Sequence, residues 1–251
     1  MSNISSNSLF HFTSKLEFLA NILENGFYPR ICMEEIILST NKLRPGMAST
    51  VPMVCFCDIS LGQISNHIDD YGNYGIGMSK EWGIEKNLNP IVYLNADSRL
   101  SSSLSDIVNS IYESLEENCT EHIKVISDEF LNVCKFLKQY SGINPKNGRQ
   151  KRFYDEKEWR FVPEMTFDES TKFSMTVDEF RNSVRLQEVN EKLKDYVIVF
   201  DINDVKYIFL EKESDIHALI SLLKKSSRFD GSQLELLTTR MITTQQIKED
   251  F

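Results

Sequence analysis

The sequence lacks the features of a membrane protein or a secreted one. No apolar run approaches the roughly 20 residues that a helix needs to cross a bilayer. The start, Met1–Ser8, is polar and has neither the basic nor the apolar region of a secretory signal. Cysteine is scarce, and its odd count of five does not suit a disulfide framework. We therefore expect a soluble cytoplasmic protein with reduced thiols and no membrane partner.

Positive charge is also in short supply. The chain has 28 Lys and Arg residues against 37 Asp and Glu residues, a net charge of -9. Broad nucleic-acid binding depends on neutralising phosphates, so this balance argues against it. The one concentrated basic run, Arg149–Arg152, leaves a local phosphate contact open as an alternative. With 251 residues and 41% hydrophobic content, the chain can bury an ordinary globular core.

Familiar cofactor and metal motifs are missing. There is no Walker loop, and Gly72–Gly77 does not match the dinucleotide-binding glycine pattern. Cys55, Cys57, Asp58 and His67 include metal-ligand types, but no C-x-x-C turn accompanies them. Both cysteines lie in a strongly apolar run, which also disfavours a reactive thiol. We expect no metal site and no cysteine hydrolase here.

The first part of the chain predicts a strand, a helix and a buried strand. Leu9–Thr13 reads as a strand whose alternation puts His11 and Thr13 on one face. A helix should follow over Leu16–Asn25, capped by Ser14 and ended by Gly26. Val51–Ile59 is continuously apolar and predicts a strand covered on both faces.

Apolar residues at four-residue spacing predict two helices between Ser98 and Tyr140, separated near Asn118–Thr120. We interpret residues 98–145 as a helical insertion in a single α+β domain spanning 1–251. Met33–Leu38 suits a strand or a helical turn. Further strands are expected over Gly75–Ser79, Pro90–Leu94, Tyr154–Val162, Tyr196–Phe200, Val205–Leu210 and Leu234–Leu237. Loops are expected over Asn41–Thr50 and Ser141–Gly148. Helices are expected over Leu61–Tyr71 and Val177–Arg181, from Ser214, and after Thr243.

Two carboxylates form the leading catalytic candidate. Glu156 and Glu158 would lie with Arg160 on one face of the Tyr154–Val162 strand. Such a pair can hold one acid ionised and stabilise the oxocarbenium-like centre of glycosidic cleavage. The competing interpretation is a solvated charged edge, which is the commoner fate of charged strand residues.

Aromatic and imidazole side chains supply the binding candidates. His11 would hydrogen-bond a ribose hydroxyl or act as a base; the alternative is a hydrogen-bonded core histidine. His67 and Tyr71 lie one helical turn apart and offer an imidazole and a stacking ring. Packing of that pair against the sheet is at least as good an interpretation.

Several of these segments together resemble the AbiGi-type abortive-infection family of phage-resistance proteins, over most of the chain. Members are described as the antitoxin half of a two-gene system, which implies binding to a cognate toxin rather than catalysis. The segments that carry the resemblance are Leu9–Thr13 with the following helix and Gly26, Pro52–Asp58, His67–Gly77, Lys80–Trp82, Glu156–Arg160 and Asp204–Ile208.

A more distant resemblance is to ADP-ribosyltransferases, including DarT-like enzymes that modify nucleic acid. It implies a mixed, split β-sheet and NAD as substrate. His11 would bind the nicotinamide ribose, Tyr71 or Tyr74 would stack on nicotinamide, Glu158 would stabilise the transition state, and Glu156 would activate a nucleic-acid or protein acceptor. Thr13, Phe56 and His67 complete the expected NAD-binding set. Cys55–Cys57 departs from the second motif of that family, so a catalytically silent antitoxin is the rival expectation.

Overall fold

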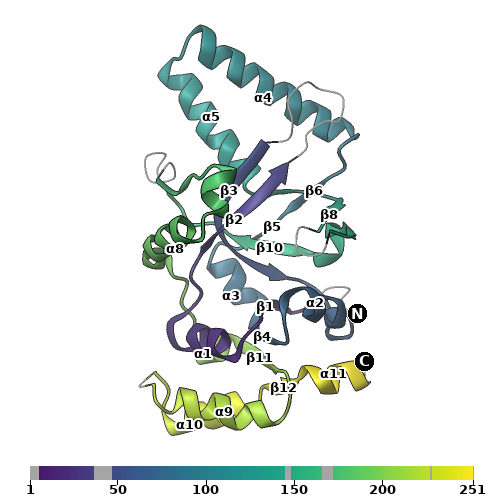
Figure 1. Cartoon of the computed structure of the whole chain (residues 1–251), viewed down its shortest axis with the longest axis vertical. Helices are drawn as coiled ribbons and strands as arrows, with labels where there is room; N and C mark the ends of the chain where they lie inside the picture. The colour runs from purple at the N-terminus through teal and green to yellow at the C-terminus, as the bar shows by residue number, and fades with distance from the viewer. Residues whose placement is uncertain (1–5, 37–46, 145–147, 166–171, 227, 251) are drawn as a thin grey trace.

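A computed structural model of the chain describes residues 6–36, 47–144, 148–165, 172–226 and 228–250 (Figure 1). Its main sheet has eight strands in the order β12-β11-β4-β1-β3-β10-β5, with β2 added to β3. β11 and β12 pair in parallel and the other pairs are antiparallel, so the expected mixed sheet of an α+β protein is confirmed. The strands are β1 (Ser8–Thr13), β2 (Arg30–Ile36), β3 (Met47–Cys57), β4 (Tyr74–Ser79), β5 (Asn89–Pro90), β10 (Glu158–Phe161), β11 (Val205–Leu210) and β12 (Met241–Thr243).

Helices cover both faces of this sheet. On one face, Phe27, Phe56 and Trp82 form the centre of the larger core, which also includes leucines from three further helices. On the opposite face, Phe10 and Cys57 belong to a smaller core with two flanking helices. The first face carries α1 (Leu16–Asn25), α3 (Lys80–Glu85), α9 (Ser214–Leu223) and α10 (Gly231–Thr238), and the second carries α2 (Ile64–Tyr71) and α11 (Thr244–Asp250). We call these the larger-core face and the smaller-core face.

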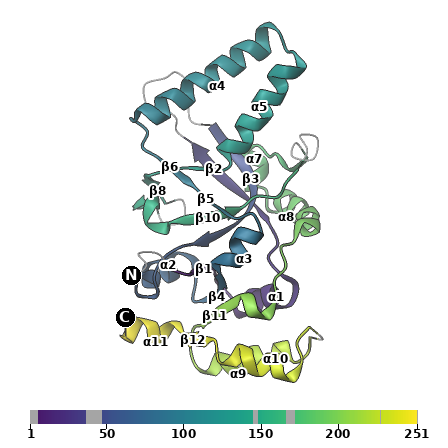
Figure 2. The ribbon, with the colours of Figure 1, turned by 180° about the vertical axis from the view of Figure 1, so that it is seen from behind.

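A helical hairpin projects from one end of the molecule. It consists of α4 (Arg99–Glu117) and α5 (Glu121–Cys134), and it lies far from α9 and α10 along the long axis (Figures 1 and 2). The two-helix prediction is confirmed, but the helical pattern ends at Cys134 rather than Tyr140. Residues 137–139 instead form β7 (Leu137–Gln139), which pairs in parallel with β6 (Val92–Leu94).

Two further pairs of elements complete the described chain. β8 (Ser141–Ile143) and β9 (Gln150–Arg152) form a small antiparallel ribbon, so the loop expected from Ser141 begins later than predicted. α7 (Val177–Arg181) and α8 (Ser183–Lys192) follow β10, and Val189 of α8 packs with Ile31 of β2 in a third core. Among the described residues, no helix combines the length and apolar character needed to cross a bilayer.

Two expected strands are absent from the sheet in the described chain. Tyr196–Phe200 makes only one bridge, from Ile198 to Phe27. The Trp82 indole donates to the Val199 carbonyl, and Arg228 donates to the Phe200 carbonyl, so side chains satisfy backbone groups that a neighbouring strand would otherwise pair. The predicted strand over Leu234–Leu237 is wrong because the segment lies in α10, whose start is stabilised by a reciprocal cap between Asp230 and Gln233.

Four local predictions concern β2, the start of β3 and the N-terminal caps of α1 and α11, and two of them are wrong. Met33 to Ile36 belong to β2, in agreement with the strand alternative, while Met47–Thr50 belong to β3 rather than to the predicted loop. The rest of that loop lies outside the described residues. Thr243 caps α11 as expected, since its hydroxyl accepts the Gln246 amide proton at 3.1 Å. The predicted Ser14 cap is wrong: Lys15 precedes α1 and provides no side-chain cap.

Gly72 ends α2 in a conformation that other residues avoid. Its φ is 116°, and its N–H donates to the Ile68 carbonyl at 2.8 Å. A Cβ at this position would lie 2.4 Å from the Thr13 carbonyl oxygen, which belongs to β1. The glycine therefore allows the end of α2 to approach the end of β1 before the chain enters β4.

Replacing Gly72 with alanine should reduce stability by about 3 kcal/mol, because positive-φ strain adds to a backbone clash. Thermal unfolding followed by circular dichroism measures the change. Gly62→Ala is the matched control, since a Cβ there meets nothing within 4 Å. Equal unfolding midpoints for the two variants would show that this close approach does not constrain the fold.

Candidate functional site

Seven ionisable side chains form a continuous series of ion pairs through the interior, which we call the charge network. Acidic and basic groups alternate along it, so that each charge has neighbours of opposite sign. Its members come from six elements: Glu34 (β2), Arg160 and Glu158 (β10), Lys138 (β7), Glu156 (a 3₁₀ turn over Phe153–Glu156), Lys151 (β9) and Asp70 (α2).

Arg160 occupies the inner end of the network. Its side chain is 0% exposed. Its Nε donates to Oε1 of Glu158 at 2.6 Å, and its Nη2 donates to Oε1 of Glu34 at 2.8 Å. Its Nη1 donates to the Lys135 carbonyl at 2.7 Å. The planar guanidinium thus joins β10, β2 and the end of α5, an arrangement that the point charge of a lysine would not reproduce.

Lys138 is the bridge between the two candidate carboxylates. Its ammonium lies 2.7 Å from Oε2 of Glu158 and 2.8 Å from Oε2 of Glu156. It also lies over the Phe153 ring, 5.1 Å from the centroid. The two glutamates are therefore not a pair of like charges in direct contact, because a cation separates them.

The outer end of the network reaches α2. The Tyr71 hydroxyl donates to Oε1 of Glu156 at 2.6 Å, and Lys151 Nζ lies 2.9 Å from the same oxygen. Lys151 also pairs with Asp70 and lies over the Tyr71 ring. Tyr71 is therefore an anchor for a carboxylate, and His67 stacks on its ring at a centroid separation of 5.4 Å.

The ion pairs decide the protonation states. Burial by itself would raise the pKa of Glu156, but Lys138 and the hydrogen bonds from Lys138, Tyr71 and Lys151 lower it to about 2. Burial likewise opposes the lowered pKa of Glu158, which the charges of Lys138 and Arg160 produce. The pKa of Lys138 is raised despite burial, because Glu158 and Glu156 face it. Both carboxylates are ionised at neutral pH.

Glu156 reaches this network by a route that differs from the prediction. The strand expected from Tyr154 begins only at Glu158, and Phe153–Glu156 forms a 3₁₀ turn. Lys157 follows it in the left-handed region, at φ 43° and ψ 54°, and this turn redirects the chain. Only Glu158 and Arg160 share a strand face as predicted. The solvated-edge alternative is wrong, since Glu156 is 3% exposed and Glu158 is 5% exposed.

A polar pocket of about 600 Å³ opens beside the outer end of the network. Its acidic and basic side chains are balanced in number, so it carries no strong preference for an anion or a cation. Burial lowers the pKa of His67, with Glu156 opposing the effect, so the imidazole at this pocket is neutral. The lining residues are Gln63, His67, Asp69, Asp70, Asn144, Arg149, Gln150, Lys151, Arg152, Asp155, Glu156 and Lys157.

His11 lies on the opposite face of the sheet from Glu158. His11 pairs with Ile76 of the larger core, and its ring contacts Phe27 and Phe56. Glu158 pairs with Cys57, a member of the smaller core, so its side chain points to the other face. The His11 Nδ1 donates to the Cys55 carbonyl at 2.8 Å, and burial lowers its pKa. This is the arrangement of a hydrogen-bonded core histidine.

The remaining predicted residues divide between the same two faces. Phe56 is buried in the larger core, and Tyr74 lies on that side with its hydroxyl donating to Glu211 and Asp215. Thr13 pairs with Tyr74 and shares its face. The structure thus groups His67, Tyr71, Glu156 and Glu158 together, and places His11, Thr13, Phe56 and Tyr74 on the other side of the sheet.

Two of the three cations that pair with the carboxylates were not predicted as their partners from the sequence. Lys138 was expected in a helix, and no local pattern marks it as a partner for residues 18 and 20 positions later. Lys151 was noted only as part of a basic run. Two of the metal-ligand types noted in the sequence, Cys57 and Asp58, make structural contacts. The Cys57 thiol donates to the Phe10 carbonyl, and Asp58 pairs with Lys80 at 2.8 Å.

Comparison with known proteins adds a relationship that the geometry does not reveal. The family model described as "Putative abortive phage resistance protein AbiGi, antitoxin" matches residues 25–211. The abortive phage resistance protein AbiGi of Lactococcus lactis subsp. cremoris is 25% identical over 247 residues, covering 90% of this chain and 99% of the relative. No solved structure matches the chain, so its likeness to an ADP-ribosyltransferase fold stays a prediction.

Glu156→Gln should destabilise the protein at neutral pH by about 3 kcal/mol, the value of a pKa shift from an ordinary 4.5 to about 2. The carboxyl has a lower pKa in the folded chain, so its contribution is present above pH 4.5 and is lost as the pH falls towards 2. Urea unfolding of wild type and variant between pH 7 and pH 3 measures this difference. Glu129→Gln, at an exposed position of α5, is the control. A wild-type-to-variant difference that stays constant with pH would contradict the assignment.

Proposed function

The chain belongs to the AbiGi family of abortive phage resistance proteins, and from that premise we propose that it is an antitoxin that binds and neutralises a toxin protein. Its proposed mode of action is direct contact, in which the antitoxin covers the surface that the toxin needs for activity. Catalysis by the antitoxin itself is not required for this role.

The observation that carries this proposal is the confinement of the candidate catalytic carboxylates within the fold. Glu156 and Glu158 each contact two cationic side chains and have almost no exposed surface. A general acid or nucleophile has to reach its substrate, whereas these groups hold β7, β9, β10 and α2 together. Because both carboxylates are buried and paired with cations, they support the role of a rigid binding protein better than that of an enzyme. The net charge of -9 also suits a partner with a basic functional surface.

Co-expression tests the antitoxin role. The toxin of the same two-gene system should arrest growth when expressed alone, and this chain should restore growth when both are produced. His67→Asn should restore growth equally well, because the variant removes an imidazole from the polar pocket without breaking an ion pair of the charge network. Gel filtration of the purified pair measures direct contact. Growth arrest by this chain alone, or no restoration and no complex, would overturn the proposal.

Transfer of ADP-ribose from NAD to a nucleic-acid or protein acceptor is a second candidate function. The observation that favours it is the polar pocket of about 600 Å³, which brings Glu156 and His67 to one opening with the basic residues Arg149, Lys151 and Arg152. This version of the site differs from the one expected from sequence, because His11 lies across the sheet and cannot contact the same NAD molecule as Glu158 without a rearrangement.

Calorimetric titration with NAD and an assay for released nicotinamide test the second candidate. It requires saturable NAD binding that His67→Asn weakens, and turnover that Glu158→Gln abolishes while Glu129→Gln leaves it intact. Circular dichroism of Glu158→Gln checks that loss of turnover is not loss of folding. Absence of NAD binding by the wild-type chain, together with full phage protection, would remove this candidate and leave the antitoxin proposal untouched.

A further inference from the structure

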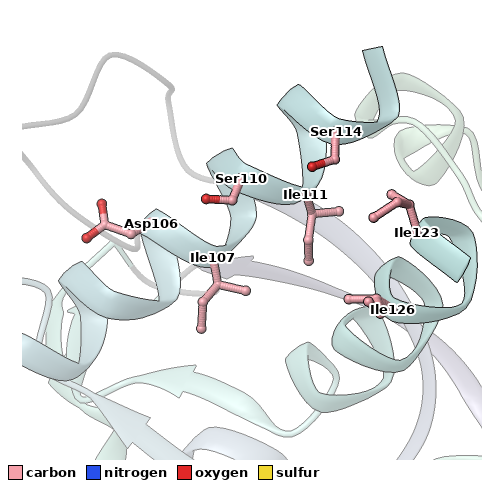
Figure 3. Close-up of a pocket in the computed structure, with 7 residues that line it drawn as sticks. All are labelled: Asp106, Ile107, Ser110, Ile111, Ser114, Ile123 and Ile126. Carbon is pink, nitrogen blue, oxygen red and sulfur yellow. The ribbon is translucent and has the colours of Figure 1, made fainter. Parts of the chain in front are cut away.

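The α4–α5 hairpin presents an apolar groove to solvent. The groove has a volume of about 360 Å³ and is lined by Ile107 and Ile111 from α4 and by Ile123 and Ile126 from α5. Figure 3 shows these isoleucines in the space between the two helices, with Asp106, Ser110 and Ser114 along α4. Ile107 is 45% exposed and Ile126 is 41% exposed. Branched aliphatic side chains gathered in one open groove are unusual on a free surface.

Little of the hairpin packs against the rest of the protein. At the base of the hairpin, Leu104 and Phe130 contact the small core around Leu94 and Leu137. Among the residues that the structure describes, Val108 and Cys134 are the only buried hydrophobic side chains on the two helices. The hairpin projects beyond the sheet in both views (Figures 1 and 2). Its exposed apolar residues also include Leu100, Tyr112, Val125, Leu131 and Val133. These side chains therefore stabilise the hairpin far less than burial by a partner would allow.

The charge of the hairpin selects among partners. α4 and α5 together carry seven acidic side chains and two basic ones, Arg99 and Lys124. A second copy of this chain would bring the same excess of acid to the groove, and like charges across an interface disfavour association. A helix with lysine or arginine beside an apolar stripe would satisfy both the groove and its acidic surroundings.

We propose that this groove is the docking site for a basic amphipathic helix of the toxin. The inference rests on the proposed antitoxin function and names the chemistry of its partner. An apolar face inserted between α4 and α5 would bury the four isoleucines, as in other complexes where a helix lies in a hydrophobic groove. The basic flanks of that helix would face the acidic side chains of the hairpin.

A synthetic amphipathic peptide of leucine and lysine is the first probe, with a leucine–glutamate peptide as its counterpart. The double variant Ile107→Asn with Ile126→Asn should weaken binding of the leucine–lysine peptide, and of the purified toxin, at least about tenfold. Asparagine keeps the net charge unchanged, so the loss reports the apolar contact. Val184→Asn, at a position of α8 that is 66% exposed, is the matched control and should bind like wild type.

A second pair of substitutions tests the electrostatic part. Glu113→Lys with Glu117→Lys should weaken binding of the leucine–lysine peptide and of the toxin more at low salt than at high salt. At high salt, screening already weakens the electrostatic attraction in the wild type, so the substitutions have less of it to remove. The leucine–glutamate peptide should bind wild type poorly. Circular dichroism and thermal unfolding of each variant confirm that the hairpin is folded.

The outcomes separate the two proposals. If wild type binds the toxin and the isoleucine variant binds it equally tightly, the groove is not the docking site, while the antitoxin role stands. If wild type neither binds the toxin nor restores growth, the antitoxin role itself fails. Concentration-dependent self-association that the isoleucine variant abolishes would assign the groove to a second copy of this chain and overturn the inference.

Discussion

Arg160 imposes the strongest physical constraint on this structure. A fully buried guanidinium is tolerated only when every side of it meets an acceptor, because transfer of an unpaired charge out of water is costly. Glu158, Glu34 and the Lys135 carbonyl supply those acceptors. Each buried carboxylate then needs a cation of its own, and Lys138 and Lys151 meet that need. The charge network extends outward until its last members reach solvent beside α2.

This constraint explains why distant segments of the chain meet. β2, β7, β9, β10 and α2 contribute one or two members each, and the removal of any one charge leaves a neighbour incompletely paired. Buried ion pairs of this kind add specificity of arrangement more than net stability. The network therefore holds the elements that flank the α4–α5 hairpin in one arrangement, including β7 at its base. Acidic residues inside the fold hold structural elements together, and those on the hairpin give the proposed docking site its negative charge.

Much of the fold could be predicted from local signals. The β1–α1 unit with Gly26, the buried β3, the two helices around Asn118–Thr120, β11 and the Thr243 cap each follow from periodicity or capping that acts over a few residues. The failures occurred where tertiary contacts override propensity. Tyr196–Phe200 has the composition of a strand, yet the side chains of Trp82 and Arg228 donate hydrogen bonds to its backbone carbonyls. Glu156 has strand neighbours on one side, yet the left-handed Lys157 turns it out of the strand.

The sequence by itself determined which side chains were candidates for a site, and that the protein is acidic, mixed α+β and related to abortive-infection proteins. Only the tertiary structure decided which of those side chains lie on each face of the main sheet. His11 and Glu158 are both polar residues on strands of one sheet, but the direction of a strand side chain depends on the register against its neighbours. That register puts His11 in the larger core and Glu158 in the charge network. Pairing across a sheet is a long-range property, so no pattern within either strand contains it.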